Sequence, residues 1–110
     1  MSKRTMSLMK KCSPIFSMLQ DERRQEILIL LFDTDDLSVT ELAARLSLSR
    51  PAVSHHLKLL LDANLLSCRK SGKERYYRLE LNSALELLNL LSDSIANDIR
   101  VKNEQRNATV

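Results

Sequence analysis

The side chains that could do chemistry are mostly basic and lie in one stretch of the chain. Between Arg45 and Arg78 there are eight Lys and Arg residues against two acidic ones, a net charge of +6, so the rest of the chain carries −3 of the overall +3. Two adjacent histidines, His55 and His56, lie in the same stretch. Guanidinium, ammonium and imidazole groups bind phosphates and base edges. A basic third of an otherwise acidic chain therefore predicts a face that binds a polyanion.

The two cysteines are the other reactive side chains. Cys12 and Cys68 are 56 positions apart and match no metal-finger spacing. A reducing cell interior keeps such residues as thiols, and we expect them to be packing residues. A thiol-based redox or metalloid sensor that uses this pair is the alternative.

Metal binding and catalysis find little support in the sequence. Neighbouring side chains on a helix diverge by about 100°, so His55 and His56 cannot easily reach one ion. The chain has no glycine-rich phosphate loop, no nucleophile elbow and no framed acid–base pair. We therefore expect no metal site, no cofactor and no enzymatic activity.

The length and composition predict one mostly helical domain. The chain has 110 residues, of which 44% are hydrophobic, with one glycine and two prolines. No run approaches the roughly 18 apolar residues of a membrane span, and residues 1–11 lack the apolar run of a signal peptide. We therefore expect a cytoplasmic protein without membrane contact. A single domain with its flanking helices is assigned to residues 1–100, and a flexible tail to residues 101–110.

Two short helices joined by a tight turn position the basic residues. Ser38 and Glu41 have the spacing of a capping box, which predicts the start of the first helix. Ser49 and Pro51 predict the start of the second helix, and Asn64 its end. Apolar side chains recur at helical spacing within the second helix: Val53, Leu57 and Leu60.

A basic hairpin follows these two helices directly. Residues 65–69 and 75–79 are predicted strands, and the turn between them contains the only glycine, Gly72. The adjacent Tyr76 and Tyr77 must point to opposite faces, so we expect one of them in the core. A helix-turn-helix followed by such a hairpin is a winged helix-turn-helix. The predicted fold is therefore mainly α with a small β-hairpin.

Apolar helices flank this unit at both ends. The pattern predicts a first helix over residues 6–19, interrupted or restarted near Pro14, and a second from Asp21 to the acidic turn at residues 33–36. The segment from residue 83 to about residue 100 is more apolar than one side of a small domain needs, which predicts dimerisation through the N- and C-terminal helices. We place six residues in the dimer interface: Ile15, Leu85, Leu88, Leu91, Ile95 and Ile99.

Four segments of the chain resemble the ArsR/SmtB family of winged helix-turn-helix transcriptional repressors in order and spacing. They are residues 21–28, 37–43, 49–60 and 72–79, and the resemblance extends over roughly residues 15–99. It implies a homodimer that represses its own operon by binding an inverted-repeat DNA operator and releases the DNA when an inducer binds. The inducer itself is not specified by these residues.

The resemblance also indicates where family members hold metals, and this chain lacks those ligands. One site is a Cys-x-Cys pair at the start of the third helix, where this chain has Ser38 and Thr40. The other lies along the C-terminal helix, with four matching positions: Leu81, Ser83, Ser94 and Asn97. Neither set is a competent group of metal ligands. The chain is therefore more similar to family members that respond to thiol oxidation or to a protein partner, or that have no known inducer.

The helix that begins at Ser49 and the hairpin are the expected contacts with double-stranded DNA. A recognition helix reads base edges in the major groove, and basic side chains bind phosphates or the adjacent minor groove. We assign eleven residues to this site: Ser49, Arg50, Pro51, Ser54, His55, His56, Lys58, Arg69, Lys70, Lys73 and Arg75. His56 borders the apolar stripe of its helix, where a packing or capping role is equally open. The alternative function is a winged helix that binds nucleic acid non-specifically or only associates with proteins.

Overall fold

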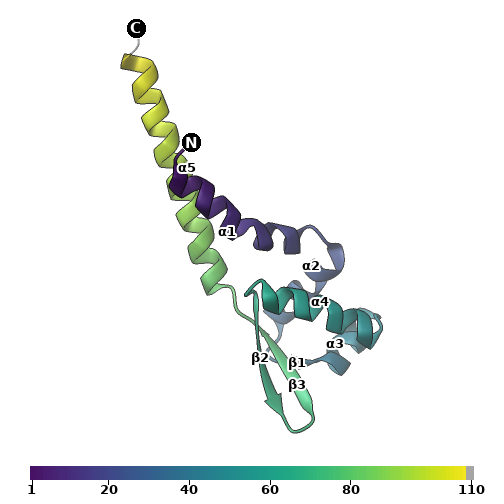
Figure 1. Cartoon of the computed structure of the whole chain (residues 1–110). Coiled ribbons are helices and arrows are strands. Elements are labelled where there is room, and N and C mark those ends of the chain that lie inside the picture. Colours follow the sequence, from purple (N-terminus) through teal and green to yellow (C-terminus); the bar gives the residue numbers. More distant parts are fainter. Residues whose placement is uncertain (109–110) are drawn as a thin grey trace.

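The computed structural model describes residues 1–108 and shows a mostly helical chain with one small sheet (Figure 1). Its elements follow the chain in this order: α1 (Lys3–Leu19), α2 (Glu22–Asp33), β1 (Leu37–Ser38), α3 (Val39–Leu46), α4 (Arg50–Asp62), β2 (Leu66–Ser71), β3 (Glu74–Leu79) and α5 (Asn82–Ala108). The predicted fold class is confirmed. The sheet is antiparallel in the order β1-β3-β2, so the predicted hairpin gains a short third strand.

The main core lies where α2, α3, α4 and the base of the sheet meet. The apolar stripes of these helices supply most of its least exposed side chains, and Leu65, just before β2, completes the set: Ile27, Leu42, Val53, Leu57, Leu60 and Leu65. A second, smaller cluster of Leu8, Cys12 and Leu91 joins α1 to α5. Burial of apolar side chains in the main core stabilises the helix-turn-helix, and burial in the smaller cluster stabilises the packing of α1 on α5.

Helix α1 is continuous, and the predicted interruption near Pro14 is wrong. Pro14 lies inside the helix, where it cannot donate a hydrogen bond to the carbonyl of Lys10. Both residues are exposed, so the missing hydrogen bond lies on the solvent side of the helix rather than on its core side. The buried face of α1 stays intact on the opposite side and maintains the helix through tertiary contacts: Thr5, Leu8, Cys12, Ile15 and Met18.

Local signals set the other boundaries as the sequence predicts. Asp21 caps α2 by accepting hydrogen bonds from the Arg23 and Arg24 amides at 2.8 and 3.1 Å. Asn64 has φ 61°, and the two hydrogen bonds around it, Asn64 N–H to Leu61 O and Leu65 N–H to Leu60 O, form a Schellman motif at the end of α4. Gly72 has φ 63° in a two-residue turn, because β2 and β3 extend to Ser71 and Glu74, beyond the predicted strand ends at residues 69 and 75.

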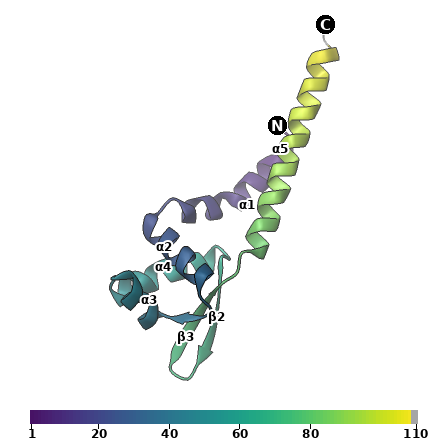
Figure 2. The same cartoon turned by 180° about the vertical axis from the view of Figure 1, so that it is seen from behind.

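Helix α5 runs to Ala108, beyond the predicted end near Arg100. Intrahelical contacts support this extension, because Arg100 donates to Glu104 at 2.9 Å and to Asn97 at 2.7 Å. The last two residues of the predicted tail lie outside the described residues. Figures 1 and 2 show α5 projecting past the start of α1, away from the sheet. The extents are 67 × 24 × 21 Å and the radius of gyration is 18.7 Å, against about 13 Å for a compact domain of this size.

Candidate nucleic-acid interface

Helix α4 presents a polar face to solvent at its N-terminal half. The Ser49 hydroxyl accepts a hydrogen bond from the Ala52 amide at 3.2 Å, and Pro51 lies in the first turn, where its missing N–H costs nothing. The buried stripe of this helix faces the core, so the opposite side chains are exposed: Arg50, Pro51, Ser54, His55 and Lys58. Five of the predicted binding residues therefore form one accessible face, next to the exposed cap Ser49.

Helix α3 holds α4 at a fixed angle through a three-residue turn. Ser38 and Glu41 form the predicted capping box at the start of α3, with amide-to-side-chain distances of 3.1 and 3.2 Å. At its end Ser47 takes a left-handed conformation with φ 55°, and the Leu48 amide donates to the Ala43 carbonyl at 3.3 Å. Such a tight connection is typical of the helix-turn-helix.

His56 faces the protein body rather than the exposed side of α4. It is half-buried, and its Nδ1 atom is buried without a hydrogen-bond partner among residues 1–108. It lies near the start of α2, where hydrogen bonding from the Arg24 amide lowers the pKa of Asp21 most and His56 is close enough for a charge on its ring to lower it further. Its exposed neighbours on α4, Ser54, His55 and Lys58, remain the predicted base-reading residues.

The hairpin divides the predicted wing residues between two faces. Lys70 pairs with Arg75 and Cys68 with Tyr77, which is buried, so these residues share the face that continues into the core. Tyr76 is half-buried on the other face, where the neighbouring Glu74 carboxylate raises the pKa of its hydroxyl. One tyrosine in the core and one outside is the arrangement that the sequence predicts.

A hollow of about 270 Å³ joins the recognition helix to the wing. Its lining comes from the start of α3, the exposed face of α4 and one side of the hairpin: Ser38, Val39, Thr40, Arg50, Ser54, Lys73, Glu74, Arg75 and Tyr77. Three of the predicted DNA-binding cations and one predicted hydroxyl thus converge on one concave surface, although they come from separate parts of the chain.

The cations of this surface form no ion pair with any acid of residues 1–108. Among residues 1–108, ion pairs occupy five arginines: Arg23, Arg24, Arg69, Arg78 and Arg100. Within the same range, none joins Arg50, Lys58, Lys70, Lys73 or Arg75 to an acid. Lys70 and Arg75 also lie directly opposite each other, and like charges in that position repel. A polyanion bound here would supply the missing negative charge.

Arg69 is the predicted wing residue that the structure places elsewhere. It lies on the outer face of the hairpin, where its Nε donates to Asp36 at 2.7 Å and its guanidinium lies 4.8 Å from the centre of the Tyr76 ring. Sequence reasoning did not single out Asp36. Strand alternation carried a usable signal, because residues 69, 76 and 78 fall on the opposite face from residues 70 and 75.

Ser38 and Ser94, two of the six positions that match family metal sites, have hydrogen-bonding roles in this chain. Ser38 caps α3, and the Ser94 hydroxyl shares a buried hydrogen bond with Thr5. Within residues 1–108, no three His, Cys, Asp or Glu side chains are grouped as metal ligands. The two thiols are separate: Cys12 is buried in the α1–α5 cluster, and Cys68 is half-buried against the main core.

The predicted dimer residues differ in how much surface they retain. Ile15 and Leu91 are 5% and 6% exposed within the single chain, so they have almost nothing left to bury. Leu85 and Ile99 are 57% and 55% exposed, and Leu88 and Ile95 are half-buried. The candidate interface is thus the second apolar stripe of α5, beside the stripe that packs on α1.

Known proteins match both the sequence and the fold. Residues 21–67 match the family model described as bacterial regulatory protein, arsR family. The arsenical resistance operon repressor of Staphylococcus aureus is 35% identical over 88 residues, covering 77% of this chain and 84% of that protein. The transcriptional activator HlyU of Vibrio cholerae is 38% identical over 84 residues, covering 74% and 77%. Among solved structures, an ArsR-like transcriptional regulator from Rhodococcus sp. RHA1 has a TM-score of 0.76 at 30% identity, covering 94% of this chain and 95% of that one.

The match to the Rhodococcus structure covers 94% of the chain and so extends beyond the helix-turn-helix into the flanking helices. No helix within residues 1–108 is long and apolar enough to cross a membrane. The exposed face of α4, the adjacent basic wing and the similarity over most of both chains agree, and the chain therefore belongs to the arsR family of bacterial regulatory proteins, as a DNA-binding transcriptional regulator.

Proposed function

We propose that two copies of this chain bind one inverted-repeat operator and repress transcription from it. The observation that carries the proposal is the set of unpaired cations on α4 and the wing, which surround one hollow. Phosphates bound there would offset their mutual repulsion and release condensed counterions from the DNA. Repression is proposed by analogy with the Staphylococcus aureus relative, which is named a repressor.

Each exposed residue has a role that follows from its position. Ser54, His55 and Lys58 lie on the exposed side of α4, where side chains reach base edges in the major groove. Arg50, in the first turn of α4, and Arg75, across the hollow, are placed to bind the phosphates that border this groove. Lys70 and Lys73 lie near the wing tip and would bind the next stretch of backbone or the minor groove.

A second copy is supported by the apolar surface that one chain leaves exposed. A groove of about 510 Å³ between α1, α2 and α5 has an almost entirely apolar lining, which includes Phe32 and Leu85 at 74% and 57% exposed. The 27 residues of α5 span about 40 Å, which is long enough to form a seam between two bodies. A two-fold seam there would present two α4 helices to half-sites about one DNA turn, roughly 34 Å, apart.

The remaining aspects of the proposal follow from DNA as the ligand. We expect the regulator to act in the cytoplasm, where its operator is, and to act by binding rather than by catalysis. A metal inducer is not part of the proposal, because neither family metal site has a competent ligand set here, and Ser38 and Ser94 form structural hydrogen bonds instead.

The test is binding to a fragment from upstream of the protein's own coding sequence, compared with a random duplex of equal length over a salt series. We expect the upstream fragment to bind at least about 10³-fold more tightly. Lys73→Ala should weaken binding to both duplexes and reduce the salt slope by about 1, whereas His55→Ala should reduce the preference for the specific fragment. Lys10→Ala, an exposed cation on α1, is the matched control.

Equal affinity for both duplexes in every salt condition would contradict a sequence-specific regulator. A reporter gene under the same upstream fragment then tests the direction of regulation: repression predicts higher expression when the regulator is deleted. Lower expression after deletion would instead assign the activating role that the name of the Vibrio cholerae relative carries.

A further inference from the structure

We infer that Asp36 is a positioning residue for DNA binding: its carboxylate holds both wing strands against the start of α3, and so aligns the wing cations with the recognition helix. This inference rests on the proposed function, since it assigns the wing a place on the operator. Asp36 itself lies outside the cationic hollow and, within residues 1–108, forms no hydrogen bond or ion pair with a residue of α4.

The geometry of Asp36 is that of a bridge between two strands. Its Oδ2 accepts a hydrogen bond from Arg69 Nε at 2.7 Å, and its Oδ1 accepts one from Arg78 Nε at 2.9 Å. Arg69 belongs to β2 and Arg78 to β3, so each carboxylate oxygen engages a different strand of the hairpin. The Asp36 side chain is only 15% exposed, whereas the two arginine side chains are 59% and 64% exposed.

Few other backbone contacts join the outer face of the wing to the rest of the protein. Strand β1 pairs with β3 through only two residue pairs, Leu37 with Tyr77 and Ser38 with Tyr76. Isolated two-stranded hairpins are marginally stable in water. Asp36 immediately precedes β1 and extends the contact outward by one residue, and the Arg69 guanidinium that it orients lies over the Tyr76 ring.

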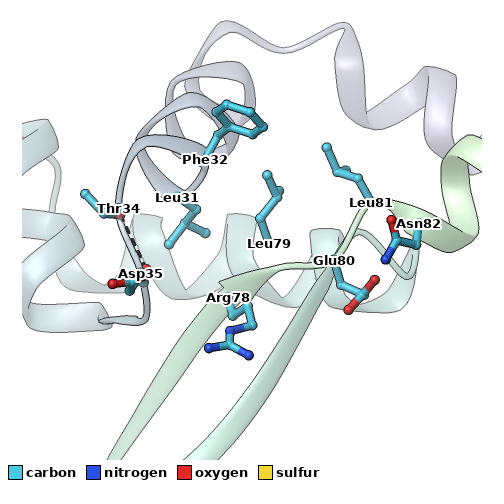
Figure 3. Close-up of a pocket in the computed structure, with 9 residues that line it drawn as sticks. All are labelled: Leu31, Phe32, Thr34, Asp35, Arg78, Leu79, Glu80, Leu81 and Asn82. Atoms are coloured by element: carbon cyan, nitrogen blue, oxygen red, sulfur yellow. Dashed lines mark hydrogen bonds between the residues drawn. The ribbon is translucent and has the colours of Figure 1, made fainter.

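Figure 3 shows that neighbouring side chains of β3 point to opposite sides of the strand near Asp35. Leu79 points toward Leu31 and Phe32 of α2, whereas Arg78 points away from them on the other side of the strand. The body therefore holds β3 by apolar packing on one side and by the Asp36 ion pair on the other.

The bridge is connected directly to the DNA-binding face. Two residues after Asp36, Ser38 caps α3, and Ser38 also lines the hollow with Arg50 and Arg75. A hairpin that turned about the β1–β3 pairs would move Arg75 relative to Arg50. In the proposed complex both arginines bind phosphates of one DNA backbone. A hairpin that rotates freely must be ordered when DNA binds, and this entropy cost lowers the affinity.

Charge gives the inference a sharp test, because positioning and simple electrostatics predict opposite results. Removing an acid raises the positive charge of the protein, which by itself strengthens binding to any duplex. If Asp36 positions the wing, Asp36→Asn should instead weaken binding to the upstream fragment about tenfold and reduce its salt slope by about 1 to 2, as wing contacts are lost. Asp35→Asn is the matched control, with the same charge change at an exposed neighbouring residue that forms no ion pair in residues 1–108.

Two further variants separate the bridge from general damage to the fold. Asp36→Glu keeps the carboxylate and should restore most of the salt slope, and Arg78→Gln removes one arm of the bridge while Asp36 stays. Amide hydrogen exchange of residues 66–79 without DNA should be faster in Asp36→Asn and Arg78→Gln than in Asp35→Asn, with residues 50–62 unchanged. This measurement tests the positioning even if the wild-type protein proves not to prefer its upstream fragment.

Two results would overturn the inference. One is an Asp36→Asn protein that binds the upstream fragment as tightly as wild type or more tightly, with the same salt slope. The other is equal exchange of the wing amides in Asp36→Asn and Asp35→Asn.

Discussion

Arginines of the same hairpin have different roles because of the strand positions they occupy. Arg78 and Arg75 are three residues apart, yet one is held by an acid on the outer face and the other is unpaired beside the recognition helix. The role of a carboxylate also depends on its surroundings. A carboxylate that accepts hydrogen bonds stabilises the fold most strongly in its ionised form. Asp98 shows this at the other end of the molecule, where its Oδ2 accepts from the Ser2 amide at 3.1 Å and from the Ser2 hydroxyl at 3.2 Å.

The first prediction concerns the pH dependence of Asp98. Hydrogen bonding from Thr5 and from the Ser2 amide lowers the pKa of Asp98 in the folded protein. A lowered pKa means that its stabilising effect is complete above the unfolded-state value of about 3.9 and disappears as the pH falls through the folded-state value. Asp98→Ala should therefore destabilise the protein at pH 7 but have a shrinking effect below about pH 4.

Urea unfolding of both proteins over a pH series measures this difference. Asp93→Ala on the same helix is the control, since Asp93 is exposed and forms no ion pair in residues 1–108. A destabilisation by Asp98→Ala that stays constant from pH 7 to pH 3 would show that the lost carboxylate was not the cause.

The short elements of the DNA-binding unit are set by capping and turn residues. Ser38, Ser49, Asn64 and Gly72 each occupy the position that their chemistry favours, at a helix start, a helix end or a hairpin turn. These signals are local in the sequence, so they predict boundaries without knowledge of the fold. Replacing one of these capping or turn residues should therefore destabilise the helix or hairpin that it bounds.

The second prediction is that Ser49→Ala destabilises the protein by about 1 kcal/mol, because the Ala52 amide loses its acceptor. Ser54→Ala is the control on the same helix: its side chain is exposed in mid-helix, where alanine has the better helix propensity. Chemical denaturation without DNA measures both. Equal stability of the two variants would mean that the cap does not determine where α4 begins.

The elements that the sequence misjudged depend on contacts between distant residues. The capping box, the recognition helix and the hairpin follow from spacing over a few positions. By contrast, the continuity of α1 through Pro14 depends on packing against α5, and strand β1 exists only because β3 pairs with it. Asp36 was missed for the same reason, since its partners lie 33 and 42 positions away in the chain.

The whole molecule is elongated because α5 extends beyond the body that supports it. One stripe of α5 packs on α1 through Leu91 and Leu87, and a second stripe remains exposed at Leu85 and Ile99. Exposed apolar patches of this kind mark association surfaces. The exposed stripe of α5 is the surface that the proposed second copy would bury.

The third prediction is that Leu85→Glu yields a folded monomer. A charge at a 57% exposed position leaves the core of the single chain intact but puts an unpaired carboxylate in the proposed seam. Affinity for the upstream fragment should fall because the second half-site is lost. Asn97→Glu is the control, at an exposed position about one-third of a turn from both apolar stripes of the helix.

Light scattering after size-exclusion chromatography gives the mass of each variant. A Leu85→Glu protein that remains a dimer with unchanged affinity would contradict the assignment of α5 as the seam. A monomeric Asn97→Glu protein would show that any added charge on α5 has this effect.

Because Cys12 is buried between α1 and α5, its reactivity reports whether these two helices are packed together. Its side chain is 0% exposed between α1 and α5, whereas Cys68 is half-buried on the hairpin. Thiol reagents need direct access to sulfur, so in a Cys68→Ser protein the rate of Cys12 alkylation should rise with the fraction of time that α1 is separated from α5. An effector that loosens or tightens that helix pair would then be detected as a change in labelling speed, before either the effector's binding site or the operator is known.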